Sequence, residues 1–158
     1  MGLTRRGICA QILSSIETYR STDFCTVNDC KVVINHLIRK FSEPLSRSGD
    51  QICYSSHAAN GAIDVETVRE HLVPVSEIMD ILLAWESLEV TDARIEEVDK
   101  LLAKMLVIVT ISKDEDAALN SSGYQRKMPP GYYDPEDRLF EDVWARYKAA
   151  GIFGNIIK

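Results

Sequence analysis

The spacing of apolar residues predicts helices over most of the 158-residue chain. In the first third, apolar side chains recur every three or four residues, the period that places them on one face of a helix. This pattern predicts a first helix over about residues 4–20 and a second that starts near Asn28 and ends at Pro44. Residues 1–47 should therefore form a helical N-terminal part.

Three further helical patterns occupy the middle of the chain. Asp64 can cap a short helix that runs up to the stop imposed by Pro74. Ser76 is placed to cap the next helix, and Thr91 or Asp92 to open another whose apolar residues again follow the helical period. We expect all three segments to pack one apolar face inward.

The pattern changes at Leu-Val-Ile-Val-Thr-Ile, residues 106–111. This continuous, β-branched apolar run predicts a strand buried on both faces. Ser112 and Glu115 match a capping box, so a short helix should follow the strand directly. Residues 51–55 fit either a short strand or an irregular turn of helix.

The last part of the chain is predicted to be a long loop followed by a helix. Residues 124–134 are rich in aromatic residues and proline, and Asp134-Pro135 is a favourable helix start that predicts a C-terminal helix over 135–150. We expect residues 1–158 to form a single globular domain. Its class is α+β and predominantly helical, with about six or seven helices around a short buried strand or small sheet.

The charge distribution restricts the binding partners. Residues 1–47 carry a net charge of +3, residues 48–120 of −10 and residues 121–158 of +1, which gives −6 for the chain. This is not the broad basic surface of a protein that grips nucleic acid over a large area. The acidic middle can be a solvated face, a cation site or a surface that docks on a basic partner.

The apolar runs restrict the location of the protein. The longest of them, residues 105–111, is far too short to span a membrane, so no membrane association is expected. The N-terminal residues lack the apolar core of a signal peptide. We therefore expect a cytoplasmic protein.

Candidate chemistry centres on His71. A histidine at a helix end is favourable against the helix dipole and needs no further role. It can also act as a general base, or bind a metal through one ring nitrogen while the other is oriented. The acidic neighbour Glu70 could orient such a ring or join it at a metal.

The sequence around His71 resembles the first motif of HNH-type endonucleases, in which an acidic residue and a histidine precede an apolar pair and a proline. These places are filled by Glu70, His71, Leu72, Val73 and Pro74. The resemblance implies that the histidine activates the attacking water. It also implies a ββα-metal unit, in which a hairpin precedes a helix that bears an asparagine and then another histidine or asparagine. This chain departs from it, since a helical pattern precedes His71 and no histidine follows.

Oxygen ligands for a metal follow the predicted strand: Asp114, Glu115, Asp116 and Asn120. Together with Glu70 and His71 they could hold Mg²⁺ or Mn²⁺, the cations that phosphodiester hydrolysis often requires. The competing interpretation is that these acids only stabilise the first turn of a helix, where negative charge opposes the helix dipole. Both interpretations stay open.

A second metal hypothesis involves zinc. Its ligands would be Cys25, Cys30, Cys53 and His57, a C-x4-C and C-x3-H pattern with suitable ligand types but loose spacing. Reduced, buried thiols are the expected state of these cysteines in the cytoplasm. We therefore favour buried thiols over a zinc site, which stays the alternative.

The aromatic loop is the second candidate site. Its residues Arg126, Lys127, Tyr132 and Tyr133 could clamp a phosphate backbone and stack on a base. They could equally form a protein-binding surface or cover a hydrophobic gap. The sequence has no glycine-rich phosphate-binding motif, so no nucleotide cofactor is expected.

Two functions from different classes fit these observations. The first is a metal-dependent hydrolase of nucleic acid, with His71 as general base and Glu70 as a metal ligand or orienting group. The second is a non-enzymatic acidic inhibitor, of the immunity type, that binds a basic protein partner through acids in 86–99. We favour the hydrolase, because it gives the motif around His71 a role.

Overall fold

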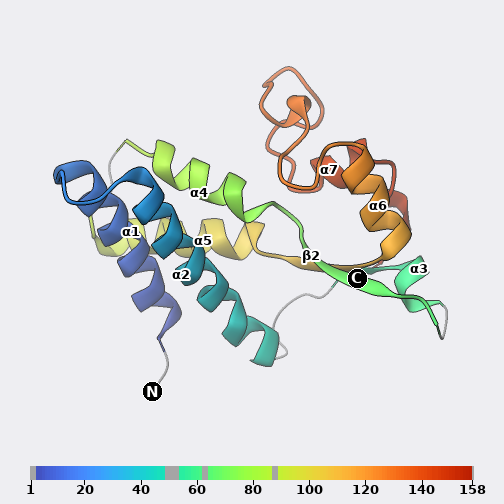
Figure 1. Ribbon diagram of the computed structural model, residues 1–158, viewed down its shortest axis with the longest axis horizontal. Helices are drawn as coiled ribbons and strands as arrows, with labels where there is room; N and C mark the ends of the chain where they lie inside the picture. The colour runs from blue at the N-terminus through green and yellow to red at the C-terminus, as the bar shows by residue number, and fades with distance from the viewer. Residues whose placement is uncertain (1–2, 49–53, 62–63, 87–88, 158) are drawn as a thin grey trace. The chain divides into compact units, whose positions relative to one another are not determined.

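The computed structural model confirms a predominantly helical α+β fold (Figure 1). It describes residues 3–48, 54–61, 64–86 and 89–157, with the side chains of 43–48 excepted. Within these ranges the chain forms seven α-helices and one four-stranded mixed sheet.

The chain divides into two compact units, each built from two separate segments. Unit 1 comprises Met1–Gln51 and Ile78–Lys104, and unit 2 comprises Ile52–Glu77 and Met105–Lys158. Each unit is described by itself below. That residues 1–158 behave as a single domain stays a prediction.

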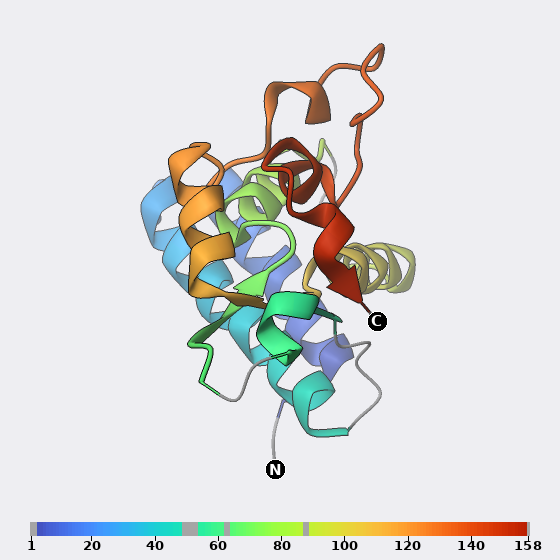
Figure 2. The ribbon, with the colours of Figure 1, turned by 90° about the vertical axis from the view of Figure 1, so that its right-hand side faces the viewer.

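Unit 1 is helical. Its helices are α1 (Arg5–Ser21), α2 (Val27–Ser48), most of α4 (Val75–Ala84) and most of α5 (Asp92–Met105). The helices α1 and α2 lie side by side, as both ribbon views show (Figures 1 and 2). Its fully buried side chains repeat at helical spacing and include Ile12 and Ile16 from α1, Ile34 and Ile38 from α2, Ile78 and Leu82 from α4, and Val98 and Leu102 from α5.

The ends of the first two helices test the boundary predictions. α1 begins where the Thr4 side chain accepts a hydrogen bond from the backbone N–H of Gly7, and it confirms the helix expected over 4–20. The predicted stop at Pro44 is wrong, because α2 continues to Ser48. A proline removes a single backbone donor from the helix, and here the helix runs on for another turn.

Unit 2 contains the sheet. Its strands are β1 (Tyr54–Ser56), β2 (Thr67–His71), β3 (Ile108–Ser112) and β4 (Ile156–Ile157). In the strand order β2-β3-β1-β4, β3 pairs antiparallel with β2 and parallel with β1, and β4 pairs antiparallel with β1. The unit also holds α3 (His57–Asn60), α6 (Lys113–Ser121), α7 (Ala145–Ala149) and the short 3-10 helices Pro130–Tyr132 and Phe153–Asn155.

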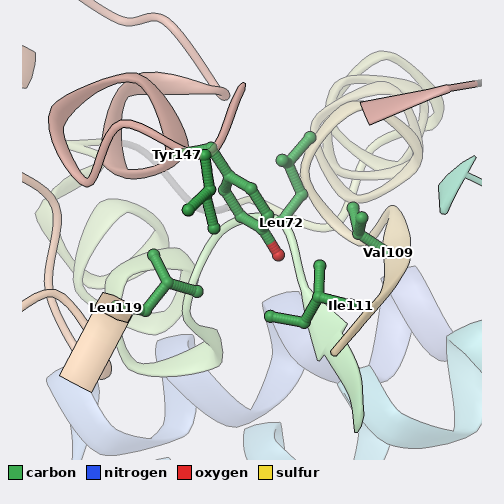
Figure 3. Close-up of a cluster of buried hydrophobic side chains, with 6 residues drawn as sticks. Leu72, Val109, Ile111, Leu119 and Tyr147 are labelled. Atoms are coloured by element: carbon green, nitrogen blue, oxygen red, sulfur yellow. The ribbon is translucent and has the colours of Figure 1, made fainter. Parts of the chain in front are cut away.

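The core of unit 2 lies on the face of the sheet that α6 and α7 cover. Figure 3 shows Leu72 and the β3 residues Val109 and Ile111 packed with Leu119 of α6 and Tyr147 of α7. All five side chains are almost fully buried. The predicted strand is thus confirmed as β3, although its alternate residues Ile108 and Thr110 are only half-buried.

The predicted helix between Asp64 and Pro74 is wrong, because residues 67–71 form β2. All five residues of β2 pair with β3, from Thr67 opposite Ser112 to His71 opposite Ile108. Hydrogen bonds to a partner about 40 residues away override the local helical pattern. Pro74 ends no helix and instead directly precedes α4.

The predicted helix over 135–150 is also wrong, since only Ala145–Ala149 is helical. Three aspartates bind the backbone N–H two residues further on: Asp134 binds Glu136, Asp137 binds Leu139 and Asp142 binds Trp144. Such turns compete with helix formation by offering the backbone other partners. Residues 135–144 consequently form successive turns.

Candidate functional site

His71 is the last residue of β2, at the edge of a strand-strand-helix arrangement. β2 is antiparallel to β3, and β3 continues without a break into α6 (Figure 2). Ser112 caps α6 by a reciprocal capping box with Glu115, as its sequence predicts. We call β2, β3 and α6 the ββα unit. The two strands are separated in sequence by α4 and α5.

A buried arginine, Arg146 of α7, holds the end of β2. Its side chain has 1% relative exposure, and its guanidinium donates to the carbonyl oxygens of His71 and of Leu72, the latter at 2.9 Å. It also donates to the carbonyls of Tyr124 at 3.2 Å and Gln125 at 3.3 Å. A buried charge with so many donors is tolerated only when these donors are paired. Arg146 therefore fixes the backbone at His71 and the start of the loop after α6.

Glu70 is the charge partner of this arginine. Its Oε2 lies 3.0 Å from Nη2 of Arg146, and its side chain is 24% exposed. Glu70 pairs with Val109 of β3, so its side chain shares the face of the sheet covered by α6 and α7. The carboxylate is thus oriented by Arg146, and its use as a metal ligand would compete with this ion pair.

Glu115 is a structural carboxylate at the start of α6. It is buried and accepts hydrogen bonds from the Ser56 hydroxyl at 2.5 Å, the Ser112 backbone N–H at 2.9 Å and the Asn155 amide at 3.2 Å. Burial raises the pKa of Glu115, but these hydrogen bonds favour the charged form and bring the pKa below its usual value. Glu115 joins β1, α6 and the C-terminal segment.

Asp116 and Asn120 lie one turn apart on α6. The amide of Asn120 donates to the Asp116 carboxylate at 3.3 Å, and Asp116 is half-buried while Asn120 is exposed. Asp114, in the first turn, is exposed. Asp116 and Asn120 together offer carboxylate and amide oxygens, the ligand type that Mg²⁺ and Mn²⁺ prefer.

Tyr147 is a buried phenol whose pKa is affected by acids from both sequence regions. Its hydroxyl is buried and has no hydrogen-bond partner among the residues that the structure describes. Burial raises the pKa of Tyr147 far above its usual value, against the opposing charge of Arg146, and the charges of Glu70, Asp116 and Glu115 raise it further. The charges of Glu70, Asp116 and Glu115 therefore all act on one phenol.

The described residues contain no cluster of three or more histidine, cysteine, aspartate or glutamate side chains arranged to hold a metal. Of the proposed zinc ligands, Cys25 and Cys30 belong to unit 1, and His57 is an exposed residue of unit 2. Cys53 lies outside the described residues.

The aromatic loop divides into buried and exposed parts. Tyr132 is buried, with 5% exposure, and its ring meets that of Tyr133 edge to face at 5.2 Å. Tyr133 is exposed and donates from its hydroxyl to Glu77 at 2.6 Å. Arg126 and Lys127 are exposed side chains. Tyr132 is thus buried, and three of the four predicted substrate-binding residues are exposed.

The loop is also fixed at its beginning. The Ser76 hydroxyl donates to the carbonyl of Arg126 at 3.0 Å, so Ser76 binds this loop and does not cap α4 as predicted. Met128 and Pro129 are buried. The backbone that carries Arg126 and Lys127 is therefore held by the Ser76 hydrogen bond on one side and by buried Met128 and Pro129 on the other.

The sequence patterns did not identify Arg146 and Tyr147 as polar residues of the site. The one sequence signal is the position of Arg146 between buried neighbours, in Trp-Ala-Arg-Tyr. A charge inside an apolar stripe is consistent with a buried, paired arginine, but nothing local identifies β2 as its partner.

Comparisons with protein-family models, curated proteins and solved structures found no match. Among the described helices, none is both long and apolar enough to cross a membrane. The function is therefore inferred from the geometry of the site.

Proposed function

We propose that this protein is a divalent-metal-dependent nuclease in which His71 is the general base. The observation that supports the proposal is the ββα unit. His71 ends its first strand, and its helix carries Asp116 and Asn120. Because side chains alternate along a strand and Glu70 faces α6, the His71 side chain projects from the opposite face of β2. The order strand, strand, helix is that of the ββα-metal unit implied by the resemblance of residues 70–74 to HNH-type endonucleases, with α4 and α5 in place of the hairpin turn. The strand at His71 removes one departure, the helical pattern in that place, whereas the absence of a downstream histidine remains.

Each group has a distinct role in this proposal. The imidazole of His71 accepts a proton from the water that attacks the phosphorus of a phosphodiester. Arg146 acts as a positioning residue, because it binds the carbonyl of His71 and so fixes the backbone from which the ring projects. Glu70 neutralises Arg146 and is a positioning residue rather than a free ligand.

Asp116 and Asn120 are ligands of the type that the required cation prefers. They lie on α6 and His71 projects from the other face of β2, so a substrate would have to cross the β2 edge of the sheet to meet both. Asp116 and Asn120 are hard oxygen donors that already contact each other at 3.3 Å. Mg²⁺ typically retains several waters and needs few protein ligands, so two donors suffice. The cation would supply positive charge for the leaving oxygen. Arg126 and Lys127 are the exposed cations that would contact the phosphate backbone.

The acidic-inhibitor alternative loses support at α5. Within the described residues, four of its carboxylates are paired with basic side chains: Asp92 with Arg6, Glu96 with Lys100, Glu97 with Arg94 and Asp99 with Arg5. Paired charges produce a weaker field at a distance than an unpaired acidic patch. The segment is therefore less able to steer a basic partner than its net charge indicates.

The test is cleavage of plasmid DNA and of structured RNA in the presence of Mg²⁺, Mn²⁺ or Zn²⁺. His71→Ala should reduce metal-dependent cleavage about 10²- to 10⁴-fold, the usual loss when a general base is removed. The matched control is His36→Ala, which removes an exposed histidine from α2 and should cut like the native protein. Circular dichroism verifies that both variants keep the native fold.

Two results would contradict the proposal. If the native protein cuts neither nucleic acid with any of the three cations, it is not a nuclease on these substrates. If His71→Ala and His36→Ala cut equally well, cleavage does not depend on the residue at the centre of the proposed site.

A further inference from the structure

A second site lies at the N-terminus of α2, in unit 1. Thr26 and Asp29 form a reciprocal capping box there. The backbone N–H of Asp29 donates to the Thr26 hydroxyl at 3.2 Å, and the backbone N–H of Thr26 donates to the Asp29 carboxylate at 2.9 Å. These two bonds fix the path of the chain as it enters the helix.

The capping box sets the positions of two cysteines. Cys25 directly precedes the capping residue and Cys30 is the fourth residue of the helix, the two positions whose side chains pack together across such a cap. Both thiols line the same groove between α1 and α2. Burial raises the pKa of the Cys30 thiol, and the charge of Cys25 raises it further.

The groove gives a small oxidant access to this pair. Its volume is about 320 Å³, and Ser15, Thr18 and Val33 contribute to its walls. Cys25 is half-buried, whereas Cys30 is 4% exposed and donates from its sulfur to the carbonyl of Ser15 at 3.6 Å. Cys25 is therefore the more accessible of the two thiols.

We propose that Cys25 and Cys30 form a redox modification site, which hydrogen peroxide converts into an intramolecular disulfide. The Cys25 thiolate attacks one peroxide oxygen, the O–O bond breaks, and the other oxygen leaves as water after taking up a proton. Cys25 is then a sulfenic acid. The Cys30 sulfur attacks the Cys25 sulfur, the S–O bond breaks, and the hydroxide leaves as a second water with the Cys30 proton. Two thiols lose two electrons and peroxide gains them.

The disulfide would change the groove. It closes a short ring over the capping box, and it takes the Cys30 sulfur out of its contact with Ser15 of α1. The oxidised form should therefore differ from the reduced form at the interface between α1 and α2. The site is in unit 1 and is independent of the proposed nuclease function.

Cys9 is the internal control for this chemistry. It is fully buried in α1, and burial raises its pKa to about 11. A thiol of this kind has little thiolate at neutral pH and reacts slowly with peroxide. Oxidation confined to Cys25 and Cys30 would thus reflect their position rather than a general reactivity of the cysteines.

The experiment uses the full chain, reduced, freed of reductant, and treated with hydrogen peroxide in the presence of EDTA. After remaining thiols are alkylated, a protease that cleaves before aspartate separates peptide 23–28 from peptide 29–49. Mass spectrometry should find these two peptides joined by a disulfide, and released by reductant. Cys25→Ser and Cys30→Ser should each abolish this species, whereas Cys9→Ser should leave it at the native level.

Other products would overturn the proposal. A disulfide that joins Cys25 or Cys30 to Cys53 would assign the reactive pair differently. Accumulation of sulfinic acid at Cys25 with a free Cys30 would show that Cys30 does not reach it, and complete retention of both thiols would show that neither is reactive. Peptide mapping of the native protein decides among these products even if a serine variant fails to fold.

Discussion

At the scale of single residues, Arg146 is the side chain with the largest structural consequence. Desolvation of a guanidinium costs several kcal/mol, and this cost is offset only when each donor finds a partner. Arg146 meets that requirement with one carboxylate, Glu70, and with backbone carbonyls such as those of Leu72 and Tyr124. Because the carbonyls belong to two separate segments, the residue acts as a link within unit 2.

Arg146→Met should be strongly destabilising. Methionine fills a similar apolar volume but leaves Glu70 and the carbonyl groups unpaired, and breaking a buried ion pair from one side costs about 3–5 kcal/mol. The free energy of unfolding from urea titration measures the loss. Arg138→Met, an exposed position in the same segment, should change it by less than about 0.5 kcal/mol. Equal losses in the two variants would contradict the role given to Arg146.

The role of Arg146 in the site could not be predicted from the sequence. His71, Asp116 and Asn120 can be selected from the sequence, because their side chains have known chemistry and their neighbours form short motifs. Arg146 follows His71 by about 75 positions in the chain. Its role depends on the pairing of β2 with β3 and on the position of α7, and no local pattern contains either.

At the scale of elements, local signals predicted β3 and α6 correctly but failed at β2 and at residues 135–144. The strand β3 and the helix α6 follow from a β-branched run and a capping box, which act within a few residues. The local pattern of β2 is that of a helix. The segment forms a strand because β3, which follows α4 and α5 in the sequence, supplies its hydrogen bonds. Asp134 is predicted to start a helix, but its side chain and that of Asp137 accept hydrogen bonds from the backbone N–H two residues further on, in turns.

The turn around Gly131 depends on one such aspartate. A Cβ atom at Gly131 would lie 2.5–2.7 Å from the carboxyl group of Asp137, which also accepts a hydrogen bond from the Leu139 backbone N–H at 2.8 Å. Gly131→Ala must displace this carboxyl group and break its hydrogen bond. Thermal or urea unfolding should show a loss of about 1–3 kcal/mol, the usual cost of overpacking.

Gly154→Ala is the matched control for this substitution. Gly154 also lies in a short 3-10 helix, and a Cβ atom there would meet nothing within 4 Å. Its substitution should be neutral or slightly stabilising, because alanine reduces the freedom of the unfolded chain. In an Asp137→Ala background, Gly131→Ala should lose most of its effect. A cost that persists without the Asp137 carboxyl group would refute this explanation.

At the scale of the whole molecule, the chain alternates between its two units. It begins in unit 1, continues in unit 2, returns to unit 1 at Ile78 and re-enters unit 2 at Met105. Neither unit is a continuous segment. β2 and β3 can pair only after the intervening segment is closed into a loop, and closing that loop costs less when the segment is already folded. The connectivity therefore favours coupled folding of the two units.

We accordingly predict a single cooperative unfolding transition, and the two tryptophans allow a direct test. Trp85 belongs to unit 1 and Trp144 to unit 2, so Trp144→Phe leaves a reporter in unit 1 and Trp85→Phe leaves one in unit 2. Trp144 contacts Tyr54 and Tyr147 edge to face, so its loss should lower the urea concentration at which half of the protein is unfolded.

The transitions are therefore compared within each variant, between tryptophan fluorescence and far-ultraviolet circular dichroism in urea. Coincident midpoints in both variants would establish one cooperative domain, because two-state unfolding requires that all probes agree. A fluorescence transition displaced from the dichroism transition in either variant would show that the units unfold separately.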